Sequence, residues 1–211
     1  MLFNVFGFIY KNFTKRIFFL IDPELFHNFI TSMGEIFGKS KIFRDLSGKL
    51  MAKKYPILKQ EIVGIKFDAP LGLAAGYDYE AKVVKVLPSF GFGFNTVGTI
   101  TNLSYEGNPK PRLGRLPKSK SLMVNKGFKN KGASWTAEKL ANQTFQIPLG
   151  ISIGKTNVKK EETQKDAIAD ILQAFNVFED SNIKNAYYEL NISCPNLFGN
   201  ISFYPPKNLD E

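Results

Sequence analysis

The sequence predicts an α/β protein whose strands form a parallel sheet. Short apolar runs recur along the chain at 70–76, 94–101, 147–154 and 186–193. Uninterrupted apolar runs of this length are typical of strands that are buried on both faces. Helical patterns lie between them, above all at 133–145 and 159–178. Strands that alternate with helices indicate βα units and therefore a parallel sheet.

Shorter elements are expected between these segments. The stretch "IVGIKFDAP", residues 62–70, suggests a small hairpin arm. The stretch "YEAKVVKVLPSFGFG", residues 79–93, suggests a short helix and a turn. Residues 102–135 are rich in Gly, Pro, Asn and Lys and are expected to form a long loop. Loops of this length are uncommon inside a compact domain unless they are functional.

Composition limits the class of protein. The chain has 211 residues, of which 44% are hydrophobic and 22% are charged, so it is globular rather than disordered. Its single cysteine cannot form an internal disulfide, which fits a reducing, cytoplasmic setting. The net charge of +9 suggests an acidic partner. The basic stretch 110–121 has no interleaved aromatic residues, so nucleic acid is not favoured.

Residues 1–55 are predicted to be an amphipathic helical segment. The first 60 residues carry ten Lys/Arg and four Asp/Glu. Lys11, Lys15 and Arg16 interrupt the first apolar run well short of the roughly 20 residues that a membrane-spanning helix needs. Asp22 is the expected N-cap of the next helix, and Pro23 suits its first turn.

That second helix has one apolar face. Six large apolar residues recur at helical spacing: Leu25, Phe26, Phe29, Ile30, Met33 and Phe37. Such a face with scattered lysines is typical of helices that lie on an anionic bilayer. The alternative is that the face packs on the core of the protein itself.

The strand ends bring polar residues together. The segments 76–78, 154–156 and 193–196 each follow a predicted strand, and the long loop follows another. In a βα barrel the carboxyl ends of the strands form the rim of the active site. These segments are therefore expected to meet at one site.

Seven segments together resemble a known family. They are "DPELFH", "PLGLAAGYD", "FGFGFNTVGTIT", "EGNPKPRLGRLP", "GFKNKG", "IPLGISIGK" and "NISCPN", in order from about residue 20 to residue 200. On them the chain resembles dihydroorotate dehydrogenase, closest to the membrane-associated, quinone-using class. The resemblance implies a (β/α)8 barrel that binds FMN and oxidises dihydroorotate to orotate in pyrimidine biosynthesis. It also implies a quinone acceptor and a peripheral site on the cytoplasmic face of the cell membrane.

The resemblance also assigns roles to individual residues. It implies FMN contacts at Ala74, Ala75, Gly76, Asp78, Thr99, Ser152 and Asn191. It implies substrate contacts at Asn125, Lys126, Gly127, Phe128, Asn191 and Asn196, with Lys126 as the positive charge for the orotate carboxylate. His27 and Arg115 would face the quinone, and no metal is implied. The structural alternatives are tight strand packing at 74–76, a turn at Asn196 and an ordinary helix residue at His27.

Cys194 falls at the position of the family's catalytic base. The reaction removes a proton from C5 and a hydride from C6 of dihydroorotate, and the hydride goes to flavin N5. A thiol, with a free pKa of about 8.5, is a suitable base near neutral pH. A lone cysteine outside this context is more often a small buried hydrophobic residue. Cysteine here belongs to the family's soluble class, so a soluble acceptor such as fumarate or NAD stays open.

Two departures from the family stand out. Tyr79 occupies a position where the family has a lysine, and Lys82, one turn further on, is a candidate substitute.

A (β/α)8 barrel takes roughly 250 residues, whereas this chain stops after the fourth predicted strand. Residues 56–211 are therefore expected to be the first half of a barrel with unpaired strand edges. The 211 residues alone are expected neither to bind FMN firmly nor to turn over.

Overall fold

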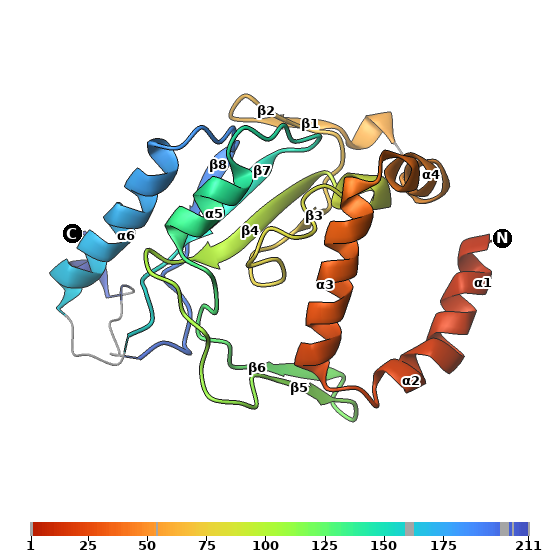
Figure 1. Cartoon of the computed structure of the whole chain (residues 1–211), viewed down its shortest axis with the longest axis horizontal. Coiled ribbons are helices and arrows are strands. Elements are labelled where there is room, and N and C mark those ends of the chain that lie inside the picture. The colour runs from red at the N-terminus through yellow and green to blue at the C-terminus, as the bar shows by residue number, and fades with distance from the viewer. Residues whose placement is uncertain (1, 54, 159–162, 199–202, 204, 211) are drawn as a thin grey trace.

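The centre of the protein is a four-stranded parallel sheet (Figure 1). The computed structural model describes residues 2–53, 55–158, 163–198, 203 and 205–210. The strands are β3 (Gly72–Leu73), β4 (Phe94–Ile100), β7 (Leu149–Ile153) and β8 (Tyr187–Leu190), and they lie side by side in chain order. The predicted α/β class with a parallel sheet is confirmed. Of the helix predicted at 159–178, residues 159–162 lie outside the described residues.

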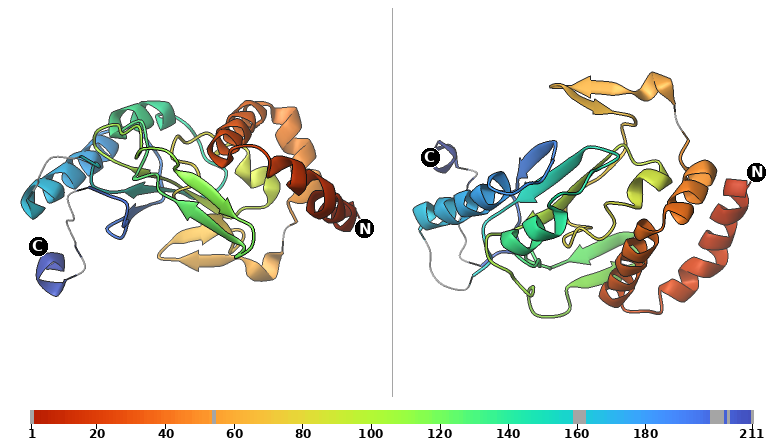
Figure 2. Two further views of the ribbon diagram at one scale, coloured as in Figure 1. Left: turned by 90° about the horizontal axis from the view of Figure 1, so that it is seen from below. Right: turned by 45° about the horizontal axis from the view of Figure 1, so that its top comes forward.

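Two helices cover one face of this sheet (Figure 2). They are α5 (Ala133–Leu140) and α6 (Gln164–Glu179). The core between helices and sheet is apolar and includes Val97, Ile151 and Phe178. The opposite face is polar: the hydroxyls of Thr96 and Tyr187 lie 2.7 Å apart. Because each strand alternates its side chains between the two faces, one face builds the core and the other stays polar.

Two hairpins flank the sheet. The predicted arm is β1 (Gln60–Ile62) paired with β2 (Ile65–Phe67), after the 3₁₀ turn Pro56–Leu58. The long loop contains a second hairpin that the sequence did not predict, β5 (Leu113–Leu116) with β6 (Ser121–Val124). The short helix expected within 79–93 is a 3₁₀ helix at Leu87–Phe90, preceded by turns. A short helix, α7 (Pro206–Leu209), lies near the carboxyl end of the chain.

The amino-terminal segment is helical, as predicted. It comprises α1 (Leu2–Ile9), a π-helical turn (Tyr10–Thr14), α2 (Lys15–Phe18), α3 (Pro23–Lys39) and α4 (Lys41–Met51). Asp22 caps α3, because its Oδ1 accepts from the amides of Glu24 and Leu25 at 3.0 and 2.9 Å. Among the described residues, no helix combines the length and the apolar character needed to cross a bilayer.

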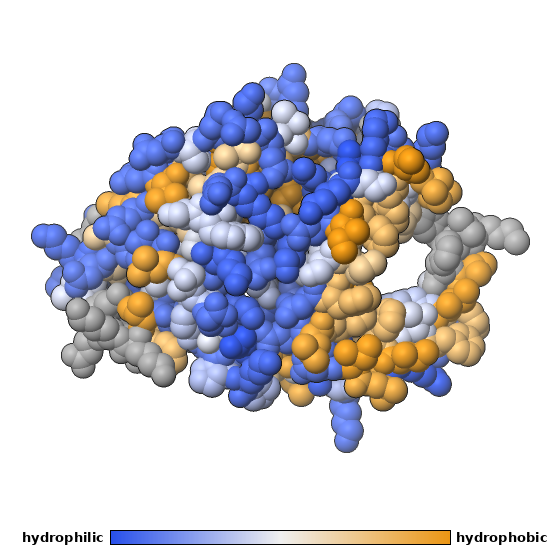
Figure 3. Space-filling model, viewed as in Figure 1, coloured by the Kyte–Doolittle hydropathy of each residue, from blue (hydrophilic) through white to orange (hydrophobic). Residues whose placement is uncertain are grey.

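Helix α3 uses its two sides differently. Gly34 and Gly38 let one side approach Val83 and Val86 closely, since a Cβ on Gly34 would lie 2.8 Å from Val83. The other side exposes Leu25, Phe29 and Ile36, each about 60% accessible: 61%, 60% and 59%. Figure 3 shows this apolar surface along α3 and along α1 and α2. The helix therefore packs on the protein and also presents apolar side chains outward.

Candidate functional site

A cavity of about 150 Å³ lies at the carboxyl ends of the strands. It collects residues from the segments after β3 and β8, from the carboxyl-terminal part of β4, and from the end of β6 and the segment after it. Its lining residues are Ala75, Gly76, Tyr79, Gly98, Thr99, Val124, Lys126, Gly127, Phe128, Lys129, Asn191, Cys194 and Asn196. The structure therefore brings together nine of the positions that the resemblance implied: Ala75, Gly76, Thr99, Lys126, Gly127, Phe128, Asn191, Cys194 and Asn196.

A row of hydrogen bonds runs across three strands beside the cavity. Asn191 Nδ2, after β8, donates to Thr99 Oγ1 on β4 at 2.8 Å. The same hydroxyl lies 3.0 Å from Ser152 Oγ on β7. Ser152 is fully buried, so it orients Thr99 and does not itself reach the cavity. The row fixes the rotamers of the polar groups that face a ligand.

Glycine exposes bare backbone at the cavity wall. Gly98 has φ +119°, and a Cβ there would lie 2.6 Å from Ser152 O. The amide of Gly76 donates to Gly98 O at 2.6 Å, which closes the segment after β3 against β4. Because neither residue has a side chain, a flat ring can approach the backbone directly.

Cys194 sits in a turn that Asn191 organises. Asn191 Oδ1 accepts hydrogen bonds from the amide and hydroxyl of Ser193, at 3.3 and 3.2 Å. The cysteine side chain is half-buried and lines the cavity. Burial raises the pKa of the thiol, and a backbone hydrogen bond from Asn196 opposes that shift. The thiol is therefore mostly protonated at neutral pH, and its thiolate form is the one that can take a proton from a bound ligand.

Lys126 brings a buried cation to the same cavity. Its side chain is among the buried charged groups at 8% exposure, and its Nζ lies 4.2 Å from the centroid of the Tyr79 ring. Burial lowers the pKa of Lys126 to about 8. No carboxylate within the described part of the chain lies within ion-pair distance of this ammonium. The cation is therefore available to an anionic ligand.

Tyr79 joins the cavity to helix α3. Its ring stacks on that of His27 with centroids 5.6 Å apart and planes at 15°, and its hydroxyl donates to Asn28 Oδ1 at 3.2 Å. Burial raises the pKa of Tyr79 well above its ordinary value, so the phenol stays protonated. The suggestion that Lys82 replaces the lysine at this position is wrong: Lys82 pairs with Glu80 at 2.7 Å and does not line the cavity.

Asn108 is a residue of this site that the sequence reasoning missed. Its Nδ2 donates to Asn125 Oδ1 and to Asn196 O, both at 2.9 Å. Its Oδ1 accepts from Tyr105 OH at 2.8 Å and from Asn157 Nδ2 at 3.1 Å. All the hydrogen-bonding groups of the amide are therefore used to hold the loops in place. In the sequence it stands in "GNP", which reads as an ordinary turn.

An ion-pair cluster ties α3 to these loops. The carboxylate of Glu24 is buried and lies 3.1 Å from Arg112 Nη1 and 3.5 Å from Lys129 Nζ. Burial raises the pKa of Glu24, but the hydrogen bonds and charges of Arg112 and Lys129 outweigh it and leave the pKa below its usual value. The carboxylate is therefore ionised at neutral pH and holds the helix against the rim of the cavity.

Other predicted residues lie outside the cavity. Asp78 is buried and accepts from the amides of Lys82 and Val83 at 2.8 and 2.9 Å, so it caps a turn. Ala74 and Asn125 do not line the cavity either. His27 Nε2 lies 2.8 Å from Tyr77 O. Burial lowers the pKa of His27, and the charge of Lys126 adds to that effect.

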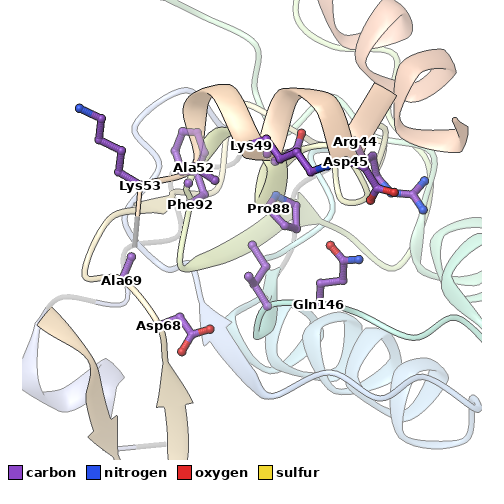
Figure 4. A pocket seen from close by; sticks show the side chains of 14 residues that line it. Arg44, Asp45, Lys49, Ala52, Lys53, Asp68, Ala69, Pro88, Phe92 and Gln146 are labelled. Carbon is purple, nitrogen blue, oxygen red and sulfur yellow. The ribbon is translucent and has the colours of Figure 1, made fainter. Parts of the chain in front are cut away.

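A larger cavity of about 540 Å³ lies at the opposite ends of the strands (Figure 4). Its lining includes Arg44 and Lys49 of α4 and Lys53, which follows that helix. Asp68 and Gln146 lie on the other side of the cavity. It contains none of the predicted site residues. In proteins built from βα units, chemistry takes place at the carboxyl ends of the strands, so the smaller cavity is the candidate site.

Fold and site together define a protein of consecutive βα units with a polar, ligand-sized cavity at the carboxyl ends of its strands. The sequence model described as dihydroorotate dehydrogenase matches residues 57–211. The chain therefore belongs to the dihydroorotate dehydrogenase family.

Individual relatives agree with this assignment. The protein named dihydroorotate dehydrogenase (quinone) of Mycobacteroides abscessus is 42% identical over 143 residues, which cover 68% of this chain and 40% of the relative. The protein of that name from Mycobacterium sp. strain KMS is 34% identical over 186 residues, 88% of this chain and 50% of the relative. The crystal structure of Eimeria tenella DHODH in complex with ferulenol superposes with a TM-score of 0.69 at 30% identity, covering 89% of this chain and 48% of that one. The chain thus spans about half the length of these relatives, or somewhat less.

Proposed function

We propose that this chain forms the first four βα units of a (β/α)8 quinone-linked dihydroorotate dehydrogenase that uses FMN. The observation that carries the proposal is that Cys194 and Lys126 line one cavity beside the polar row that ends in Asn191. A base, a cation and amide groups at one place suit an anionic heterocycle that must lose a proton. Family membership supplies the identity of that heterocycle, dihydroorotate.

Each residue has a distinct task in this proposal. The ammonium of Lys126 binds the carboxylate of dihydroorotate, a charge-assisted contact that is stronger than a neutral one. The amides of Asn191 and Asn196 can both donate to and accept from its ring. The thiolate form of Cys194 takes the proton from C5 and becomes the thiol, as a general base within the cavity. Bound FMN supplies the acceptor for the hydride that leaves C6.

The residues at the cavity wall fit a flavin. Ala75, Gly76 and Gly98 present a surface without large side chains, against which a flat ring can lie. Thr99 and Asn191 add fixed polar groups that suit the donors and acceptors of its edge. We therefore assign the ring of FMN to this wall.

The helical segment supports the quinone and membrane part of the proposal. The segment from α1 to α3 exposes apolar side chains, including Phe13 of the π-helical turn, Leu20 of the turn after α2 and Phe29 of α3, at 62%, 87% and 60% accessibility. Exposed apolar surface of this extent marks an interaction site. In the proposal it rests on the cytoplasmic face of the membrane, and His27 and Arg115 face the quinone.

A soluble electron acceptor is the second candidate, and Cys194 favours it. The two are separated by assaying the holoenzyme that contains this chain for dihydroorotate oxidation with a short-chain quinone and, in parallel, with fumarate and NAD. We expect turnover with the quinone only. Dihydroorotate oxidation with fumarate or NAD but not with the quinone would show that the acceptor is soluble. The absence of dihydroorotate oxidation with every acceptor would overturn the proposed dehydrogenase activity. For the 211 residues alone, we expect a colourless preparation without firmly bound flavin.

A further inference from the structure

The β5–β6 hairpin is tied to the corner between α2 and α3. Arg115, on β5, donates from Nη1 to Ile21 O at 2.6 Å. Its guanidinium also lies 4.9 Å from the ring of Phe19 and 5.8 Å from that of Phe26. The tip of the hairpin therefore projects from the same edge of the molecule as this corner (Figure 1).

This edge is apolar on its surface. Exposed large side chains gather there, and we call them the apolar rim: Phe19, Leu20 and Ile21 of the turn between α2 and α3, Leu25 of α3 and Leu116 of the hairpin. Figure 3 shows apolar surface over this corner and along the lower part of α3. Contiguous exposed apolar surface is costly in water and indicates a partner.

Most of the charges beside the apolar rim are positive; Asp22, between Ile21 and Leu25, is the exception, and its carboxylate caps α3. Lys118 and Lys120 are exposed at the hairpin tip, where the hydroxyls of Ser119 and Ser121 lie 2.7 Å apart and close the turn. Among the described residues, neither lysine forms an ion pair with a carboxylate. Residues 107–132 contain eight Lys/Arg and no Asp or Glu, although Arg112 and Lys129 pair with Glu24 and Lys126 lines the cavity. Residues 2–21 contain three Lys/Arg and no Asp or Glu. The edge is therefore complementary to an anionic surface.

We propose that the hairpin tip is a second membrane contact, in which Lys118 and Lys120 bind anionic lipid headgroups while the apolar rim enters the bilayer. The inference rests on the proposed function, which already places α1 to α3 at the membrane. Nucleic acid would neutralise the lysines but leave the apolar rim in water. An anionic bilayer can accept both the lysines and the apolar rim. The alkyl chains of the lysines lie along apolar surface while their ammonium groups reach the lipid headgroups.

The test is vesicle flotation of the holoenzyme with the Lys118→Ser/Lys120→Ser double variant. Each lysine near an anionic surface strengthens binding about fivefold, so the pair contributes about 25-fold. We expect the double variant to lose about this factor in partitioning to phosphatidylcholine vesicles that contain phosphatidylglycerol, and to match the wild type on phosphatidylcholine alone. Activity with a soluble short-chain quinone should stay unchanged, since neither lysine lines the cavity.

A matched control removes the same charge elsewhere. Lys165 and Lys184 are exposed and lie at or near α6, at the far end of the molecule from the hairpin. The Lys165→Ser/Lys184→Ser variant should keep wild-type binding to anionic vesicles. Equal losses in both double variants, or none in the hairpin variant, would overturn the inference while leaving the membrane site of the helices intact. A wild-type holoenzyme that binds neither kind of vesicle would overturn that membrane site itself.

Discussion

Lys126 Nζ lies 4.2 Å from the centroid of the Tyr79 ring. A buried ammonium usually has a carboxylate partner, whereas this one faces an aromatic ring and a ligand cavity. The ring is itself held from behind by His27 and Asn28 of α3. Helix α3 therefore contributes indirectly to positioning the cation at the site.

Replacing the cation should weaken substrate binding. Charge-assisted hydrogen bonds contribute about 1.5–3 kcal/mol, so Lys126→Met should raise the KM for dihydroorotate about 10- to 150-fold. Lys131 is exposed and close in sequence, and it serves as the control: Lys131→Met should leave KM unchanged. The measurement is steady-state kinetics on the holoenzyme. Equal KM values for the two variants would remove Lys126 from the substrate site.

Orotate binding should depend on pH through the same residue. Because burial lowers the pKa of Lys126 to about 8, its ammonium is mostly protonated at pH 7 and loses its proton as the pH rises through about 8. Orotate affinity should therefore fall at higher pH, by up to about tenfold per pH unit. Flavin absorbance titrations between pH 7 and 9.5 measure this. Lys126→Arg should bind orotate with no such fall, since arginine stays charged.

The ring of Tyr79, rather than its hydroxyl, should matter for this affinity. Tyr79→Phe keeps the ring under Lys126 and loses only the bond to Asn28. Tyr79→Leu removes the ring, and a partly desolvated cation–π contact is worth about 1–2 kcal/mol. We expect orotate affinity near wild type for the first variant and about 5- to 30-fold weaker for the second. A larger loss of orotate affinity in Tyr79→Phe than in Tyr79→Leu would show that the hydroxyl, and not the ring, positions the site.

Cys194 should control the proton-transfer step. A positioned general base contributes about 10²–10⁴-fold, so Cys194→Ala should slow flavin reduction by dihydroorotate by that factor while flavin content stays unchanged. Because burial raises the thiol pKa, the wild-type rate should keep rising with pH beyond the ordinary thiol range. Cys194→Ser should retain more activity than Cys194→Ala. Rapid-mixing measurements of flavin bleaching separate the three proteins, and an undiminished rate in Cys194→Ala would remove the base from the mechanism.

The elements with strong apolar patterns could be predicted from the sequence. Buried strands such as Leu149–Ile153 and the capped helix Pro23–Lys39 have patterns that local physics determines. The hairpin Leu113–Val124 could not, because its strands have only four residues each, Gly114 interrupts the first, and its position depends on contacts with α3 and the turn before it. Residues 79–86 have a helix-like apolar spacing, but Asp78 caps a turn there instead.

The candidate site divides in the same way. Residues at or just after the carboxyl ends of strands, such as Thr99, Asn191 and Cys194, could be assigned because parallel strands deliver their ends to one edge. Asn108 could not, since three of its four side-chain hydrogen-bond partners, Asn125, Asn157 and Asn196, lie far from it in the sequence. The contact between Lys126 and Tyr79 likewise joins residues 47 positions apart by number, and only the fold brings them together.

Asn95 gives a prediction about stability. It is fully buried on β4, and among the described buried side chains its amide is the one whose polar atoms have no hydrogen-bond partner. An unsatisfied buried polar group costs about 1–3 kcal/mol. The isosteric change Asn95→Leu should therefore stabilise the holoenzyme and raise its Tm by about 2–4 °C for each kcal/mol gained.

The neighbouring Thr96 provides the matched control for that change. Thr96 is on the same strand as Asn95 but faces the other side of the sheet, where its hydroxyl lies 2.7 Å from that of Tyr187 on β8. Thr96→Val keeps the shape of the side chain but leaves the phenol without this partner, so Tm should fall. The two apolar substitutions therefore act in opposite directions because only Thr96 has a partner to lose. Calorimetry of both variants checks this, and a lower Tm in Asn95→Leu would mean that the Asn95 amide has a partner after all.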